Sequence, residues 1–173
     1  VIAPNSWEYG TMSRDNLTSG VVGAMYTSNS SVDPRAVNAP VTVDLGSVQS
    51  VGGVRLYPRD TTYINYPTAI DMAISTDGVN YETILTLEDI PLPTGESQFF
   101  TFNNPVNARY VRVVPTEIGS GEDVSGTTAY RFQLVALEIA PAMVNGANNP
   151  IPNGLVSQNG AKQVSVLYPI DAV

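Results

Sequence analysis

One short segment concentrates charged, amide and aromatic side chains between two stretches that alternate like β-strands. It runs from Arg59 to Tyr66 and also contains Asp60, Tyr63 and Asn65. Arg, Asp and Asn carry planar groups that form paired hydrogen bonds, and each tyrosine ring offers a flat apolar face. A sugar presents paired hydroxyls and an apolar ring face, so these residue types predict a shallow carbohydrate site. The alternatives are that Arg59 simply pairs with Asp60 and that Tyr66 only caps a strand.

The composition excludes several other classes of chemistry. The 173-residue chain has no cysteine and no histidine, so it cannot build Cys or His zinc sites, His-based triads or thiol nucleophiles. A net charge of -8 argues against nucleic acid and against a basic patch on anionic lipid. No apolar run is long enough to span a bilayer, so we expect no membrane insertion. Neutral sugars and calcium suit this surface better.

Acidic residues that are neighbours in the sequence give no sign of catalysis. The pairs Glu88-Asp89 and Glu122-Asp123 fall in predicted turns, where adjacent side chains normally diverge into water. A glycosidase needs two carboxylates held about 5 to 9 Å apart across a cleft. We therefore predict that the chain is not an enzyme and that Glu122 and Asp123 belong to a solvated loop.

Short alternating stretches bounded by Gly, Pro and Asp-Gly supply the elements that position these loops. Val41, Val43 and Leu45 alternate with polar residues, which is the period of a half-buried strand. No window has apolar residues at helical spacing over three turns, and residues 1–40 predict irregular structure. The pattern predicts an all-β sandwich or barrel. The expected strands cover residues 41–45, 54–57, 70–75, 81–87, 97–102, 109–114 and 132–139.

The amino-acid composition changes after Pro141. Residues 142–173 are rich in Asn, Gly and Pro, and we expect them to form a linker or the start of a following domain, with the sandwich confined to residues 1–141. Only one of the 8 basic residues is Lys, and Asn, Thr and Ser are plentiful. This composition is typical of an exported protein, so we expect a secreted or cell-surface location.

Several short blocks occur in the order and at the spacing of a known family. The blocks are VDLG at residues 43–46, VGGVRLYPR at 51–59, YP at 66–67, ISTDGVNY at 74–81, ARYVRV at 108–113 and LEI at 137–139. Together they resemble the discoidin domain, also called the coagulation factor type C family, whose bacterial relatives include the family 32 carbohydrate-binding modules. The resemblance implies an eight-stranded jelly-roll β-sandwich of the galactose-binding-domain-like type, with binding loops at one end.

The same resemblance assigns roles to individual residues. Arg59 matches a sugar-contacting Arg, and Tyr130 lies in the segment that the family places near the binding end. Asp15 and Thr18 resemble a loop that coordinates a structural calcium ion, with Glu138 as its partner in the last strand. Calcium takes several carboxylate, carbonyl and hydroxyl oxygens, which this loop offers.

Glu138 is informative without the family as well. It lies in phase with Phe132 and Leu134, so its carboxylate is expected to point into a partly apolar layer and to need compensation. The alternative is that Glu138 pairs with an Arg or lies on a solvated face of the sheet.

These observations predict a non-catalytic carbohydrate-binding module that binds a glycan, an oligosaccharide or polysaccharide, and is monomeric as an isolated domain. We expect it to be an ancillary domain of a larger secreted or surface glycosidase or adhesin. Two alternatives stay open: a discoidin-type domain that binds protein in adhesion, and a structural spacer without ligand.

Overall fold

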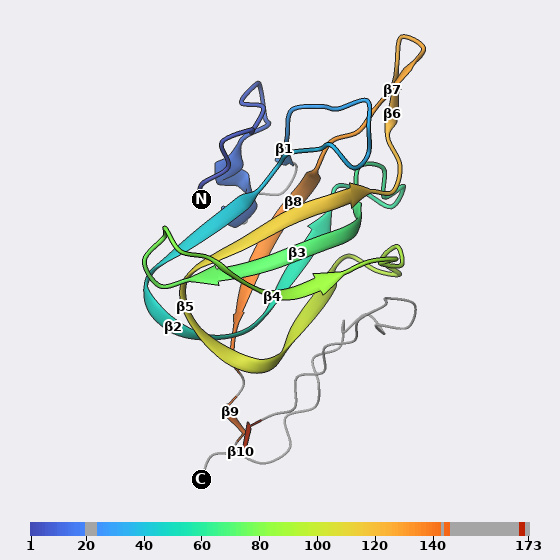
Figure 1. Ribbon diagram of the computed structural model, residues 1–173. Coiled ribbons are helices and arrows are strands. Elements are labelled where there is room, and N and C mark those ends of the chain that lie inside the picture. The colour runs from blue at the N-terminus through green and yellow to red at the C-terminus, as the bar shows by residue number, and fades with distance from the viewer. Residues whose placement is uncertain (20–23, 143, 146–169, 172–173) are drawn as a thin grey trace.

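The computed structural model describes residues 1–19, 24–142, 144–145 and 170–171, and its main feature is one antiparallel sheet (Figure 1). The sheet has six strands in the order β1-β8-β2-β5-β3-β4. Their bounds are β1 (Tyr26–Thr27), β2 (Val41–Pro58), β3 (Pro67–Ser75), β4 (Glu82–Leu87), β5 (Gln98–Ile118) and β8 (Gln133–Pro141). The smaller elements are the 3-10 helix η1 (Arg14–Thr18), the hairpin β6 (Glu122–Val124) and β7 (Thr127–Ala129), and the short parallel pair β9 (Val144–Asn145) and β10 (Ile170–Asp171).

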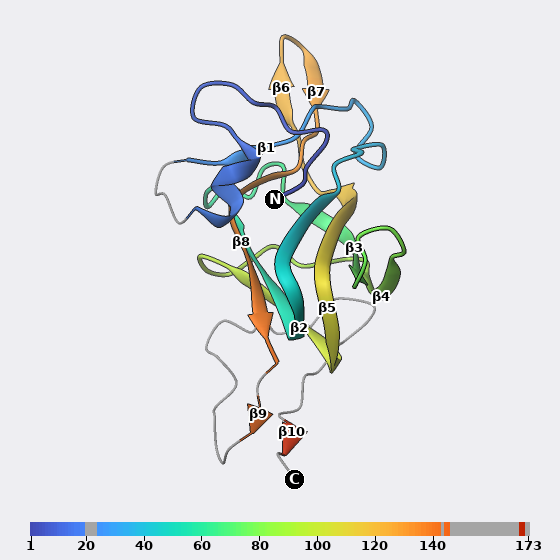
Figure 2. The same ribbon diagram turned by 90° about the vertical axis from the view of Figure 1, so that its left-hand side faces the viewer.

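Two long strands turn this sheet into a sandwich. β2 has 18 residues and β5 has 21, and their mutual register shifts between Asp44 and Gln49 and again between Val51 and Gly53. Such irregularities bend a strand, and both strands curve in the two perpendicular views (Figures 1 and 2). The second half of β2 pairs with β8 and the first half of β5, whereas the second half of β5 pairs with β3 and the first half of β2. The six-stranded sheet therefore becomes eight segments in two layers when β2 and β5 are each counted twice.

The core lies between these two layers. In one layer Val113 lies opposite both Val41 and Met72, and in the other Val54 lies opposite Phe100. Directly opposed residues share a face of the sheet, and these five side chains are all buried. Alternation of apolar and polar residues thus places one face of each strand in the core, which confirms the predicted all-β sandwich.

The predicted strands are found, but two pairs of them are continuous. The stretches expected at 41–45 and 54–57 are both parts of β2, and those expected at 97–102 and 109–114 are both parts of β5. Pro115 does not end β5. It lies opposite Ile70, next to a shift in the register between β3 and β5, and Pro is tolerated at such irregularities. Most of residues 142–173 lie outside the described part, so the predicted linker remains a prediction. Among the described residues, no helix is long and apolar enough to cross a membrane.

We expect Gly53→Ala to destabilise the fold, because Gly53 lies at the bend of β2. An added Cβ would lie 2.9 Å from the ring of Phe99 and would also clash with the backbone oxygen of Phe100. Overpacking of this kind costs about 1–3 kcal/mol, and each kcal/mol lowers Tm by about 2–4 °C in a domain of this size. Gly95→Ala is the matched control, because nothing lies within 4 Å of its added Cβ. Thermal unfolding that gave both variants the same Tm would contradict the close approach at Gly53.

Candidate functional site

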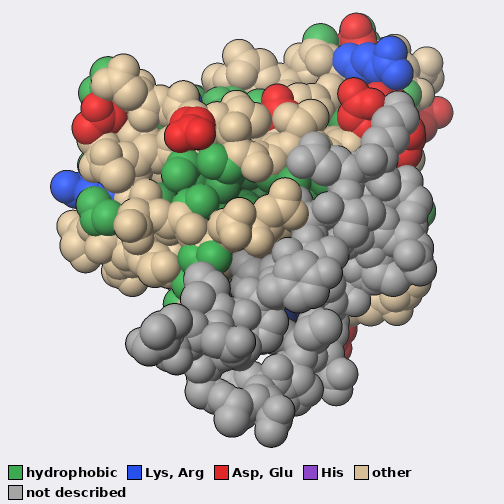
Figure 3. Space-filling model, turned by 60° about the horizontal axis from the view of Figure 1, so that its bottom comes forward, with side chains coloured by type: hydrophobic (Ala, Val, Ile, Leu, Met, Phe, Trp, Pro, Cys, Tyr) green, Lys and Arg blue, Asp and Glu red, His purple; other side chains and the backbone are tan. Residues whose placement is uncertain are grey.

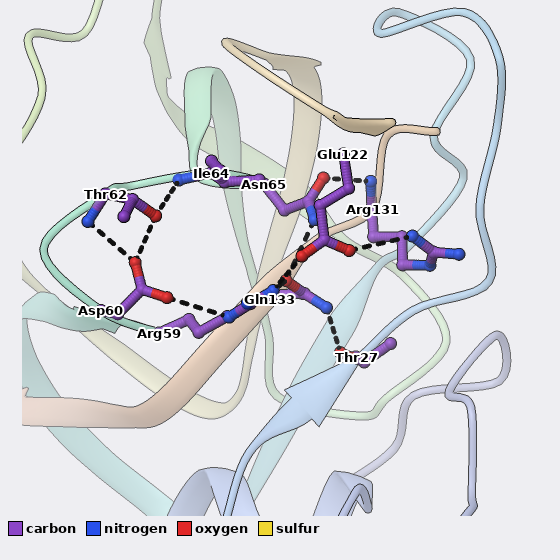
Figure 4. A network of polar contacts seen from close by, with 9 residues as sticks. All are labelled: Thr27, Arg59, Asp60, Thr62, Ile64, Asn65, Glu122, Arg131 and Gln133. Atoms are coloured by element: carbon purple, nitrogen blue, oxygen red, sulfur yellow. Dashed lines mark hydrogen bonds and ion pairs between the residues drawn. The ribbon is translucent and has the colours of Figure 1, made fainter. Parts of the chain in front are cut away.

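Three segments from distant parts of the sequence meet at one end of the sandwich. They are the loop of residues 59–66 between β2 and β3, the hairpin β6–β7, and residues 130–133 leading into β8. The hairpin projects from this end in both ribbon views (Figures 1 and 2), and the polar contacts between the segments are drawn in Figure 4.

Asn65 joins the three segments from the inside. Its side chain is fully buried; Oδ1 accepts the backbone N–H of Arg131 at 3.0 Å, and Nδ2 donates to Oε1 of Gln133 at 3.0 Å. Its backbone N–H donates to the oxygen of Ser120 at 2.8 Å, and its carbonyl accepts the N–H of Gln133 at 3.2 Å. Asn65 has a φ of 63°, a left-handed conformation that Asn adopts more readily than most residues. Its burial leaves no surface for a ligand, so Asn65 positions the site from within.

Arg59 lies at the surface end of the same network. Its Nε is 3.0 Å from Oδ2 of Asp60, and its Nη1 donates to Oε1 of Gln133 at 3.0 Å and pairs with the carboxylate of Glu122. The hydrogen bond with Glu122 raises the pKa of Arg59, and hydrogen bonding from Thr62 lowers the pKa of Asp60. Both groups are therefore charged at neutral pH. The Arg59 side chain is 28% exposed, so part of the guanidinium faces solvent.

A hollow of about 350 Å³, here called the Trp7 hollow, opens beside Arg59. The Trp7 residue is 43% exposed, and the guanidinium of Arg131 lies 5.4 Å from the centroid of its ring. Nη1 of Arg131 is 3.5 Å from Oε2 of Glu122, and its buried Nε has no hydrogen-bond partner in the described part of the chain. The hollow is lined by Trp7, Met12, Met25, Thr27, Arg59, Glu122, Val124, Arg131 and Gln133.

A second hollow, of about 470 Å³, is lined by Asp60, the ion-pair partner of Arg59; it is called the Tyr63 hollow. Tyr57, Pro58, Asp60, Thr61, Tyr63, Thr94, Gly95, Glu96 and Val135 line it. The predicted ligand residues are therefore divided: Arg59 borders one hollow, and Asp60 and Tyr63 border the other.

Two further predicted ligand residues lie elsewhere. Tyr66 is 1% exposed, and its hydroxyl donates to Oε1 of Gln98 at 2.9 Å; burial raises the pKa of this phenol. Tyr130 is half-buried and packs on the core, and its backbone pairs with that of Ser31. Neither residue lines the Trp7 hollow or the Tyr63 hollow.

Sequence reasoning predicted only Arg59 among the residues that line the Trp7 hollow, and the aromatic and charged residues that it missed are Trp7, Glu122 and Arg131. Trp7 is the single Trp of the chain, in a segment expected to be irregular, and Arg131 directly precedes a predicted strand. Glu122 was expected in a solvated loop, but it pairs with two arginines. The lone Trp and the position of Arg131 were visible in the sequence, whereas the pairing of Glu122 depends on how the hairpin folds back.

Glu138 does not point into an apolar layer, so this part of the prediction is wrong. The pairing of β8 with β2 shifts register between Tyr57 and Pro58. The one extra residue of β8 at this point reverses the face of the sheet on which the following β8 side chains lie. Glu138 therefore lies on the outer face with its side chain 59% exposed. Its Oε2 accepts the hydroxyl of Tyr57 at 2.8 Å and is 3.5 Å from Nε of Arg55, which is the alternative left open by the sequence.

The side chains around Glu138 do not fit the calcium site that was predicted. Thr18, at the end of η1, lines a hollow with Glu138, but Asp15 does not. Calcium takes six to eight oxygen ligands, and the one carboxylate here is already paired with Arg55. No group of three or more acidic residues that could hold a metal occurs within the part of the chain that the structure describes. Calcium remains a prediction from the sequence alone.

The first prediction for this region concerns Asn65. Asn65→Ala leaves the Arg131 backbone N–H without its acceptor, removes one donor to the side-chain Oε1 of Gln133, and puts Ala in a left-handed conformation. We therefore expect the free energy of unfolding to fall by about 2–4 kcal/mol. Asn65→Gly removes the same hydrogen bonds without the conformational cost and should lose less. Urea unfolding of the two variants measures both effects. Two variants as stable as the wild type would show that Asn65 does not hold the loops together.

The second prediction concerns calcium. Because Arg55 already neutralises Glu138, we expect a chelator to leave the Tm unchanged in both the wild type and Glu138→Gln. A metal bound only by the folded state would instead raise stability by about 2.7 kcal/mol at a hundredfold excess over Kd. A Tm that falls with chelator, recovers with calcium and becomes insensitive in Glu138→Gln would restore the calcium site.

The described surface carries few charges on the face shown in Figure 3, where uncharged side chains and backbone predominate. This agrees with a chain in which only 14% of residues are charged.

Comparisons with solved structures find the same fold in carbohydrate-binding modules. The module CpGH89CBM32-5 from Clostridium perfringens, solved in complex with GalNAc-β-1,3-galactose, has a TM-score of 0.62 and 16% identity, covering 80% of this chain and 92% of that one. The family 32 module of Clostridium perfringens NanJ, in complex with galactose, has a TM-score of 0.57 and 17% identity, covering 80% and 90%. Chitosan-binding module 1 from a chitosanase/glucanase of Paenibacillus sp. IK-5 has a TM-score of 0.60 and 23% identity, covering 80% and 91%.

The family follows from the sequence comparison. The comparison with curated proteins found no match. The family model of the F5/8 type C domain, however, matches residues 3–129, which include all the short blocks named above except the last. The chain belongs to the F5/8 type C domain family.

Proposed function

We propose that this protein is a non-catalytic carbohydrate-binding module that binds a glycan in the Trp7 hollow. The observation that carries the proposal is the pairing of an exposed indole with two fixed guanidinium groups and a carboxylate in one hollow. The indole offers a flat surface for the apolar face of a sugar ring, and the guanidinium and carboxylate groups suit its paired hydroxyls.

The electrostatics of the Trp7 hollow favour an uncharged sugar unit at that position. Arg59 and Arg131 are balanced by Asp60 and Glu122 through ion pairs, so the network has no excess charge to attract an ionic ligand. The ion pairs also fix the side chains before a ligand arrives, which reduces the conformational entropy lost on binding.

The similar structures support the same class of ligand. Those compared above are a module in complex with GalNAc-β-1,3-galactose, another in complex with galactose, and a chitosan-binding module. We propose that this chain serves as the sugar-binding part of a larger exported enzyme or adhesin and has no catalytic role of its own.

Titration with the best ligand from a glycan array tests the proposal. A small open site predicts a Kd on the order of 0.1 to 1 mM, or about -4 to -5.5 kcal/mol. We expect Trp7→Ala to weaken binding about tenfold or more, because an anchoring Trp contributes much of the affinity of such sites.

Two variants control this titration. Glu122→Gln removes one charge with little change of shape, which should weaken binding and leave Arg59 and Arg131 without their shared partner. Arg109→Ala breaks the exposed pair with Asp44, away from this end, and should bind normally. A glycan that binds Trp7→Ala as well as the wild type would move the site away from the Trp7 hollow. Failure of every glycan would favour the adhesion alternative.

A further inference from the structure

The Tyr63 hollow has the chemistry of a second sugar contact, and its lining differs from that of the Trp7 hollow. Its surface is mainly apolar, formed in part by Tyr57, Tyr63 and Val135. Tyr63 is half-buried and packs against the core, so its ring is held in place. Fixed aromatic rings beside an open hollow are suited to stacking on the apolar face of a sugar.

The charged residues that line this hollow are acidic. Among the described residues, Asp60 and Glu96 line it, and neither Lys nor Arg does so. Asp60 is neutralised from behind by Arg59, at 3.0 Å. Glu96 is exposed and forms no ion pair within the described residues, so no described cation is paired with its carboxylate.

Tyr57, whose ring lines the hollow, lies within reach of charges of both signs. The pKa of Tyr57 is raised, first by burial and next by the hydrogen bond and charge of Glu138; the cation of Arg55 lowers it, and the carboxylate of Glu96 raises it by a smaller amount. Of these three charged residues, Glu96 is the one that also lines the hollow. A cation placed over such a ring is attracted by its π face and by the nearby carboxylate together.

We propose that the Tyr63 hollow binds a hexosamine unit with a free, protonated amino group, stacked on Tyr63 with its ammonium next to Glu96. The proposal rests on the function proposed above and adds the kind of glycan, a chain that contains amino sugars. Arg59 lines the Trp7 hollow and its ion-pair partner Asp60 lines the Tyr63 hollow, so the proposal places neighbouring units of one oligosaccharide in the two hollows.

A matched pair of ligands tests the proposal: a glucosamine hexamer and the corresponding fully N-acetylated hexamer, which differ in charge but not in length. In calorimetric titration at low salt we expect the wild type to bind the glucosamine hexamer about fivefold more tightly, the size of one exposed ion pair. Because salt screens an exposed pair, the preference should largely disappear at about 0.5 M NaCl.

Variants assign that preference to the hollow. We expect Glu96→Gln to abolish the preference, while Glu82→Gln, which removes an exposed carboxylate from β4, keeps it. Tyr63→Ala should weaken binding of the glucosamine hexamer, and Tyr63→Phe, which keeps the ring, should not. Tm values of all variants show whether they are folded.

The outcomes separate the two proposals. Equal affinity for the two hexamers, no binding of either, or a preference that survives Glu96→Gln would overturn this inference, and the Trp7 hollow would then be judged by its own titration. Glu96→Gln could lose the preference while Trp7→Ala binds as well as the wild type. This pair of results would support amino-sugar binding in the Tyr63 hollow and overturn glycan binding in the Trp7 hollow.

Discussion

The buried amide of Asn65 is the contact on which the arrangement of the loops depends. A fully buried Asn side chain must find partners for its polar atoms. Asn65 finds them in the N–H of Arg131 and the side chain of Gln133, while its backbone bonds to Ser120 and Gln133. The loop after β2, the base of the hairpin and the start of β8 are thereby fixed to one another.

The surface network is built on that buried contact. Gln133, held by Asn65, directs its Oε1 to Arg59 and its Nε2 to Oγ1 of Thr27, at 2.7 Å. Arg59 then divides its donors between Gln133, Asp60 and Glu122. Figure 4 shows how this chain of contacts runs from a buried amide to partly exposed charges. The order from inside to outside explains how polar side chains on loops obtain fixed positions, which a weak and specific site requires.

The bent strands decide which side chains reach this end. β2 runs through both layers and delivers Arg59 and Asp60 just beyond its last residue, Pro58, while β8 delivers Arg131 just before its first residue. The two strands are neighbours in the sheet, so residues about 70 positions apart in sequence come within hydrogen-bonding distance. Each member of the Arg59–Asp60 ion pair lines one hollow, Arg59 the Trp7 hollow and Asp60 the Tyr63 hollow.

The sequence by itself determined the fold class and singled out residues 59–66 as a candidate binding loop. Period-two alternation places apolar residues on one face, and the ordered blocks from Val43 to Ile139 predicted the family, because both depend on residues that are near one another in the chain. The tertiary structure decided which side chains of that loop reach the surface. Asn65 is buried and Tyr66 bonds to Gln98, whereas Trp7, Glu122 and Arg131 come from other segments. The outward direction of Glu138 was likewise decided by one irregular residue in the pairing of β8 with β2. Alternation is a local property, but the register between strands and the closure of loops depend on partners far apart in the sequence, and only the folded chain brings those together.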